Sequence, residues 1–313
     1  MSMLTKRQLA HTYSIVALDP GVGQLGVAVQ SHYFGTGSAV PWVEAGVGAV
    51  ATQSFVEISY GPLGLAMMKA GKSASQALAG LIAADPQQER RQVAMVDIHG
   101  NVAAHTGERC IAAAGHRTGD GYSVQANLML RATVWDAMAE TYEETSGELA
   151  ERMMAALEAA EAEGGDIRGR QSAAMVVVNA APSGQAWQDR LVDLRVDDHP
   201  EPLVELRRLL TVRRAYDGWN AAEAMLQGDN LATAKVAAAA ARFSEAPDLM
   251  PINPEGLFWF GCALVNAGQL DAALPYFRRV YAVQPVWREL IPRLADAGLL
   301  PQDVVRLRRL IEL

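Results

Sequence analysis

The stretch Thr12-Tyr13-Ser14-Ile15-Val16-Ala17 opens an ordered series of β-like segments in the first part of the chain. It continues to Leu18, and a second run, Leu25–Ser31, follows after the turn signal Asp19-Pro20-Gly21. Proline fixes φ and glycine accepts a positive φ, and apolar residues alternate in the second run. The pattern therefore predicts a β-hairpin at the head of a folded domain.

Beyond this hairpin, groups of strand-like segments alternate with pairs of helical segments. Ser73 is a plausible N-cap for one of the helices. We expect further strands at Ala39–Trp42, Val47–Gln53, Val93–Asp97, Val102–His105, Tyr122–Asn127, Ser172–Asn179 and Leu191–Val196. We expect helices at Gly61–Ala70, Ser73–Ala84, Ala132–Glu144 and Glu148–Glu161. This order predicts an α+β fold in which sheets pack together with helices outside.

The composition changes near Asp197-Asp198-His199-Pro200, and everything from there to Leu313 is helical in pattern. We therefore expect an N-terminal extension (1–11), an α+β domain (12–199) and a helical domain (200–313). Part of the last domain has the residue offsets of a tetratricopeptide-like repeat, at Gly261, Gly268, Ala273, Phe277 and Pro285. Its aromatic residues are expected to be packing core, with a carbohydrate or peptide groove as the alternative.

Composition excludes several classes of partner. The net charge is -8 and no run of Lys or Arg is present, which argues against nucleic acid. No apolar run reaches the roughly 18–20 residues that span a bilayer, and residues 1–11 lack the apolar centre of a secretory signal. The two cysteines, Cys110 and Cys262, lie far apart, which predicts a reducing cytoplasm rather than a disulfide framework.

Thr12 is a candidate nucleophile. If the residues before it are removed, its own α-amine can take the hydroxyl proton, so one residue supplies both nucleophile and base. The reaction would be acyl transfer, and backbone N–H groups around Gly46-Val47-Gly48 are candidates to bind the oxyanion. The alternative is a β-branched residue that begins a strand, which is common.

A second group of candidates precedes the apolar run Ala173–Val178. Asp166 and Arg168 are suited to pair with each other or to bind a substrate amide or carboxylate in a fork geometry. Gln171 and Ser172 follow them as candidate substrate-binding residues. The alternative is a structural ion pair that shapes this loop.

Thr52 and Gln53, at the end of a predicted strand, are also candidates to line the cleft, unless they pair across strands.

Neither a nucleotide nor a metal site is indicated. Gly21-Val22-Gly23-Gln24-Leu25-Gly26 matches the dinucleotide fingerprint, but a strand follows it where a helix is required. Gly35-Thr36-Gly37-Ser38 lacks the lysine of a phosphate loop, and the histidines and cysteines show no ligand spacing. Cys110 is expected to be a half-buried structural thiol. The alternative is a Cys–His nucleophile, because His105 lies nearby in the sequence. We expect no cofactor and no metal.

Many ordered blocks of this sequence resemble the bacterial and archaeal family called domain of unknown function 1028. The resemblance extends from about Thr12 to Asp197. It rests on Thr12–Ala17, Gly26–Ser31, Val40-Pro41-Trp42, Ala45–Ser54, Tyr60–Leu65, Arg91-Gln92-Val93, Thr106–Cys110 and Gly164–Ala174.

The resemblance implies an N-terminal-nucleophile (Ntn) hydrolase-like fold, a four-layer αββα sandwich. The helical tail around Asn253–Leu300 also resembles a C-terminal segment of some relatives that is associated with peptidoglycan binding. In typical relatives the threonine corresponding to Thr12 directly follows the initiator methionine, whereas eleven residues precede it here. In this chain an internal cleavage or a different translation start would be needed to expose the Thr12 amine.

The expected function is hydrolysis of an amide-type C–N bond in a small-molecule or peptide-like substrate. Thr12 would be the nucleophile, and Asp166 and Arg168 would position the substrate. Ntn-like folds often assemble through their helical layers, so we expect a homo-oligomer. The alternative function is a catalytically silent fold that binds a ligand or partner through its helical tail.

Overall fold

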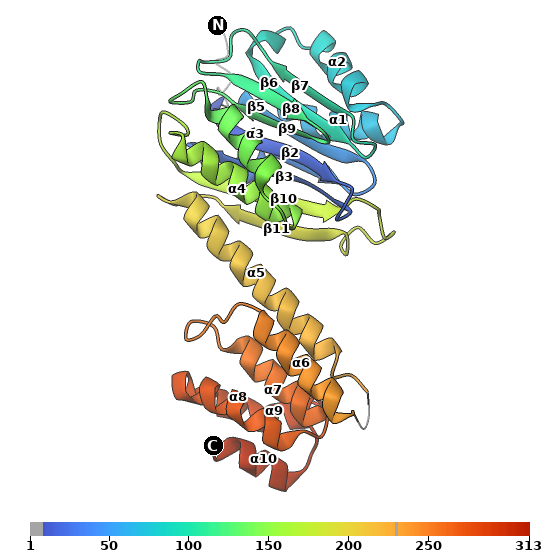
Figure 1. Cartoon of the computed structure of the whole chain (residues 1–313), viewed down its shortest axis with the longest axis vertical. Helices are drawn as coiled ribbons and strands as arrows, with labels where there is room; N and C mark the ends of the chain where they lie inside the picture. Colours follow the sequence, from blue (N-terminus) through green and yellow to red (C-terminus); the bar gives the residue numbers. More distant parts are fainter. Residues whose placement is uncertain (1–8, 229–230) are drawn as a thin grey trace, which may run out of the picture. The chain divides into compact units, whose positions relative to one another are not determined.

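The computed structural model describes residues 9–228 and 231–313, so residues 1–8 of the predicted extension lie outside the described residues. The chain forms two compact units, one ending at Arg208 and the other spanning Leu209–Leu313. The first is the α+β part and the second is helical (Figure 1).

Two antiparallel sheets form the centre of the first unit. One has the order β1-β5-β6-β7, with β4 also paired to β5. Its strands are β1 (Leu9–Ala10), β4 (Pro41–Glu44), β5 (Gly48–Phe55), β6 (Arg91–Asp97) and β7 (Val102–Thr106). The other has the order β11-β10-β3-β2-β9-β8. Its strands are β2 (Thr12–Asp19), β3 (Gln24–Ser31), β8 (Gly115–Gly119), β9 (Tyr122–Ala126), β10 (Ser172–Asn179) and β11 (Arg190–Val196).

Helices cover the outer face of each sheet. Helices α1 (Tyr60–Lys69) and α2 (Ala74–Ala84) contact β5, β6 and β7, whereas α3 (Val134–Glu144) and α4 (Leu149–Ala162) contact β2, β3, β8 and β9. Ser73 caps α2 with a complete capping box, as predicted. The sheets contact each other through β2 and β5, β6 and β9, and β4 and β10. The expected α+β fold, with paired sheets between helices, is confirmed at this level.

The layer between the two sheets is apolar at one end and polar at the other. Alternate residues of each strand point into it. The apolar end includes Val16, Leu18, Leu25, Val27, Val29, Ala49, Ala51, Ala94 and Val96. At the other end, the same faces carry the buried side chains of Thr12, Ser14, Ser31, Gln53, Gln92, Gln125 and Asn127. Burying polar groups is unfavourable unless they are hydrogen-bonded, so this end needs a specific explanation.

The second unit is a stack of helices around an aromatic core. Helix α5 (Pro202–Ala224) contributes its residues from Leu209 onward. It is followed by α6 (Thr233–Glu245), α7 (Glu255–Asn266), α8 (Leu270–Val283), a short 3-10 helix (Pro285–Glu289), α9 (Leu290–Asp296) and α10 (Val304–Ile311). No strand follows Val196 within the described residues. The predicted packing role of the aromatic residues is confirmed, because Phe258, Phe260 and Phe277 are fully buried. Within the described ranges, no helix is both long and apolar enough to cross a membrane.

Candidate functional site

Thr12 is the first residue of β2 and is fully buried at the polar end of the inter-sheet layer. Its Oγ1 donates to the carbonyl oxygen of Ala10 at 2.7 Å. Its own carbonyl oxygen accepts from the backbone N–H of Asn127 at 3.1 Å and from Gln53 Nε2 at 3.2 Å. In the intact chain, the Thr12 nitrogen is an amide joined to His11, so Thr12 is not yet an N-terminal nucleophile.

The peptide carbonyl before Thr12 is held by two strong donors. Ser31 Oγ donates to the His11 oxygen at 2.6 Å, and Arg168 Nη2 donates to the same oxygen at 2.9 Å. Asp166 fixes this guanidinium, since its carboxylate accepts from Arg168 Nε at 3.0 Å and from Nη2 at 2.6 Å. The Asp166 side chain is fully buried. Donors of this kind stabilise negative charge that develops on a carbonyl oxygen during acyl transfer.

The segment before Thr12 is held against the edge of β5. Leu9 and Ala10 pair antiparallel with Phe55 and Ser54 of β5. The His11 side chain is only 2% exposed and meets the Phe55 ring edge-on, with ring centroids 5.6 Å apart. Its Nδ1 lies 2.7 Å from Asn127 Oδ1, and its buried Nε2 has no hydrogen-bond partner among the described residues. The carbonyl and side chain of His11 are thus bound as a ligand's would be.

Hydrogen-bonded side-chain amides surround this segment, and the donor and acceptor of each can be assigned. Gln92 Nε2 donates to Thr106 Oγ1 and to the backbone oxygens of Gly115 and Ala126, so its Oε1 must be an acceptor. That Oε1 accepts from Gln53 Nε2 at 2.7 Å and from Asn127 Nδ2 at 2.9 Å. Asn127 therefore presents its Oδ1 to His11 as an acceptor, and the neutral His11 ring donates Nδ1–H to it.

The network continues along the floor of the layer. Ser14 Oγ donates to Gln53 Oε1 at 2.6 Å and accepts from Gln125 Nε2, also at 2.6 Å. Ser123 Oγ donates to Gln125 Oε1 at 2.9 Å. Each amide is thereby held in one orientation, which gives a rigid polar floor beneath Thr12.

The structure thus brings four predicted residues together: Thr12, Asp166, Arg168 and Gln53. Thr52 and Gln171 lie elsewhere, whereas Ser172 lies opposite Ser31 in the register of β3 and β10 but bonds to other groups. Thr52 faces the opposite side of the sheet from Gln53 and donates to the Glu57 oxygen at 3.1 Å, because successive strand residues point to opposite faces.

Gln171 and Ser172 have structural partners instead. Gln171 Nε2 binds Asp198 at 3.1 Å, and Ser172 Oγ donates to the Tyr33 oxygen and accepts from the Thr36 amide. The turn at Gly46-Val47-Gly48 is also remote, since it precedes β5, whose far end carries Gln53. The intervening strand spans roughly 20 Å. The donors on the carbonyl oxygen are Ser31 and Arg168 rather than this turn.

Sequence reasoning missed Ser31, His11, Gln92, Gln125 and Asn127. A signal was present in Tyr122–Asn127, where polar residues alternate with apolar ones. Such alternation normally indicates a strand with one solvated face. Here the second sheet covers that face. Among the described residues, no group of three or more His, Cys, Asp or Glu side chains is placed to hold a metal ion.

Docking of His11 is expected to depend on pH. Burial lowers the pKa of His11 from its ordinary value of 6.5 and the Arg168 charge lowers it further, while the Asn127 hydrogen bond and the Asp166 charge raise it. The chain with His11 docked against Asn127 therefore binds fewer protons than the intact chain with His11 exposed to solvent. Its stability is fully present above pH 6.5 and is lost progressively as the pH falls towards the lowered pKa.

The measurement is hydrogen exchange of the amides of residues 10 and 11, corrected for intrinsic exchange rates. We expect protection to decrease between about pH 7.5 and about pH 5.5. A His11→Gln variant, which keeps an N–H donor but does not titrate, should lose this dependence. Equal protection at both pH values in the unaltered chain would contradict the assignment of a neutral, buried imidazole.

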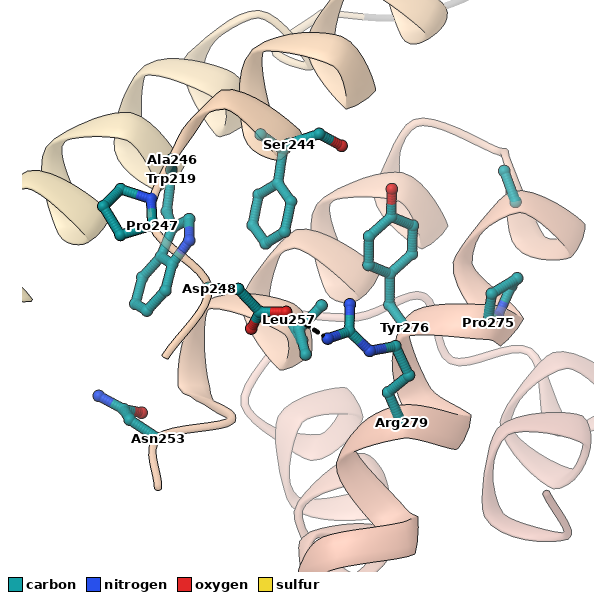
Figure 2. A pocket seen from close by; sticks show the side chains of 12 residues that line it. Trp219, Ser244, Ala246, Pro247, Asp248, Asn253, Leu257, Pro275, Tyr276 and Arg279 are labelled. Atoms are coloured by element: carbon teal, nitrogen blue, oxygen red, sulfur yellow. Dashed lines mark hydrogen bonds and ion pairs between the residues drawn. The ribbon is translucent and has the colours of Figure 1, made fainter. Parts of the chain in front are cut away.

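The second unit contains a separate pocket of about 490 Å³ (Figure 2). Its wall includes the Trp219, Phe243 and Tyr276 rings, and Asp248 and Arg279 form an ion pair of 2.6 Å at its rim. Figure 2 shows this pair between the Trp219 and Tyr276 rings. Asn253 adds a polar group. Flat rings together with exposed polar groups suit a ligand that is partly apolar and partly hydrogen-bonding.

Comparison with known proteins identifies the first unit. A model described as "Family of unknown function (DUF1028)" matches residues 12–206. The crystal structure of protein SPO2555 from Silicibacter pomeroyi, which carries the same family assignment, is similar with a TM-score of 0.61 and 29% identity. The match covers 67% of this chain and 90% of that one. A search of curated proteins found no match. Since the family model matches more than half of the sequence, this chain belongs to the DUF1028 family.

Proposed function

We propose that this protein is the precursor of an Ntn-type amidohydrolase, and that breaking the His11–Thr12 bond exposes Thr12 as its nucleophile. The observation that carries the proposal is the pair of donors on the His11 oxygen, Ser31 Oγ at 2.6 Å and Arg168 Nη2 at 2.9 Å. Both are aimed at the carbonyl of the one bond whose cleavage would free the Thr12 amine. The packing of two antiparallel sheets between helical layers supports the Ntn-like assignment.

Release of the segment proceeds by an acyl shift within the chain. The Thr12 hydroxyl turns from the Ala10 oxygen and attacks the His11 carbonyl carbon, while Ser31 and Arg168 stabilise the charge on its oxygen. The C–N bond breaks, and the proton from the hydroxyl passes to the departing Thr12 nitrogen. Water then hydrolyses the ester, which leaves a carboxylate on His11 and restores the hydroxyl of Thr12.

The released site can repeat the same chemistry on a substrate. The free α-amine has an ordinary pKa of about 7.7–8.0, so near neutral pH it can accept and return the hydroxyl proton. Ser31 and Arg168 would bind the oxygen of the substrate amide, and the Gln53 and Asn127 amides would line the cleft beside it. A C–N amide-type bond is therefore the bond that this arrangement favours.

The test is a time course of intact mass on the purified full chain. We expect a product that begins at Thr12. Arg168→Gln should slow its appearance by about 100-fold, the typical loss for one oxyanion donor. Arg170→Gln is the matched control, because Arg170 lies two residues away and pairs with Glu161 and Glu201 rather than with His11. Absence of release from the unaltered chain, or equal rates in the two variants, would contradict the proposal.

A second candidate function is ligand binding by the helical unit. The pocket beside Trp219 favours it, because three aromatic rings and an ion pair border one cavity of about 490 Å³. Carbohydrates and peptides both combine flat apolar faces with hydrogen-bonding groups. Titration with oligosaccharides and short peptides, followed by tryptophan fluorescence, should give a saturable change that Tyr276→Ala and Trp219→Phe both remove. A chain that gives no change with any of these ligands would exclude this function.

A further inference from the structure

The geometry points to an extended peptide as the substrate class, bound as an added strand on β5 with a histidine-like N–H donor just before the cleaved bond. This inference rests on the proposed function for the identity of that bond. Its evidence is separate, however, and lies in how Leu9-Ala10-His11 is held. The segment acts as a built-in ligand that reports what the cleft recognises.

The main chain of the ligand is recognised at the stretch of the β5 edge that β4 does not reach. One edge of β5 pairs with β6 along its length, from Gly48 to Ser54. The other edge pairs with β4 only as far as Ala51, where β4 begins at Pro41. Beyond Ala51 this edge is taken by Val40, whose oxygen binds the Thr52 amide, and then by β1 opposite Ser54 and Phe55. Strand addition of this kind binds a peptide backbone without regard to its side chains.

The side chain is recognised by Asn127. Its Nδ2 is committed to Gln92 Oε1, and Gln92 is itself held in one orientation by three acceptors. The Oδ1 of Asn127 therefore faces the ligand as an acceptor and requires a donor. An apolar residue leaves this buried acceptor unpaired. A carboxylate places a second acceptor oxygen against Asn127 Oδ1, and the two oxygens repel each other. The expected loss in affinity is roughly 10- to 100-fold.

Two further features favour a neutral ring over other donors. The edge of the Phe55 ring is positioned for an aromatic partner, with centroids 5.6 Å apart and an interplanar angle of 89°. A lysine would bring a charge into a buried site beside the Arg168 guanidinium, which both burial and like charge disfavour. Neutral histidine meets both conditions, and glutamine or asparagine meets the donor requirement alone.

The test measures peptide binding without catalysis. The full chain carrying Thr12→Ala and His11→Ala keeps residues 1–11 attached but weakens their hold on the cleft. Isothermal titration should show that acetyl-Leu-Ala-His-amide binds at least about tenfold more tightly than acetyl-Leu-Ala-Ala-amide. The same peptide with an Nδ1-methylated histidine should bind as weakly as the alanine peptide, because it cannot donate to Asn127. Equal affinities for the three peptides, or no binding, would overturn the inference.

A second measurement avoids any effect of His11→Ala on folding. In the full chain with Thr12→Ala alone, millimolar histidine peptide should accelerate hydrogen exchange of residues 9–11 by displacing them, and the alanine peptide should not. Neither experiment depends on bond cleavage. If selective binding occurs and the His11–Thr12 bond is never broken, the inference stands and the proposed function fails. If the segment is released but the peptides bind alike, the function stands and the inference fails.

Discussion

Replacing Thr12 with alanine should leave residues 1–11 attached to the chain under conditions in which the unaltered protein releases them. Without the hydroxyl no ester can form, so we expect the rate to fall on the order of 1000-fold or more. Thr12→Ser keeps a hydroxyl on the same strand position and should retain release. The measurement is the fraction of intact mass that remains over time.

Thr52→Ala is the matched control for this variant. Thr52 is as fully buried as Thr12, but its hydroxyl binds the Glu57 oxygen on the other face of the sheet. It should release the segment at the rate of the unaltered chain. Equal release from Thr12→Ala would mean that another protein cuts this bond, and the nucleophile assignment would then be abandoned.

Replacing Gln92 with leucine should cost about 3 kcal/mol or more of the free energy of unfolding. Leucine has a similar size but removes the acceptor of Gln53 Nε2 and Asn127 Nδ2, and the donor to Gly115 and Ala126. Several buried polar groups then lose a partner at once. Urea unfolding followed by circular dichroism measures the change.

Gln188→Leu provides the comparison, because Gln188 is exposed and, among the described residues, its side chain bonds only to the side chain of Gln185. Its effect should be within about 0.5 kcal/mol. If Gln92→Leu were equally mild, the amide network would not be the rigid floor that orients Asn127, and the basis for ligand selection would be lost.

Much of the α+β fold was predictable because its strands have strong local patterns. The apolar run Ser172–Asn179 was predicted with the bounds that β10 has. The hairpin around Asp19-Pro20-Gly21 was predicted from its turn residues and is confirmed. The strand β8 (Gly115–Gly119) was missed, because glycines and exposed polar residues give it no periodic signal and only pairing with β9 makes it a strand.

The site was predictable in part. Asp166 and Arg168 were singled out because an acid and a base two residues apart are suited to pair, and they do pair beside His11. Thr52 and Gln53 were both proposed to bind substrate, but their side chains lie on opposite faces of β5, since neighbouring strand residues face opposite ways. The roles of Gln92 and Asn127 were not predictable. The alternation in Tyr122–Asn127 indicates a strand with one polar face, but only the second sheet buries that face.

The most direct test of this account is chemical labelling of the Thr12 amine in the full chain after incubation at neutral pH. Mild periodate oxidises an N-terminal threonine to an aldehyde, because the amine and hydroxyl sit on adjacent carbons, and an aminooxy probe captures the product. The account predicts that the label is carried by a chain whose intact mass shows that it begins at residue 12. A label on Ser2, which becomes N-terminal if Met1 is removed, marks a chain that still has its extension. A chain from which the segment before Thr12 is never lost, whether or not Ser2 is labelled, would contradict it.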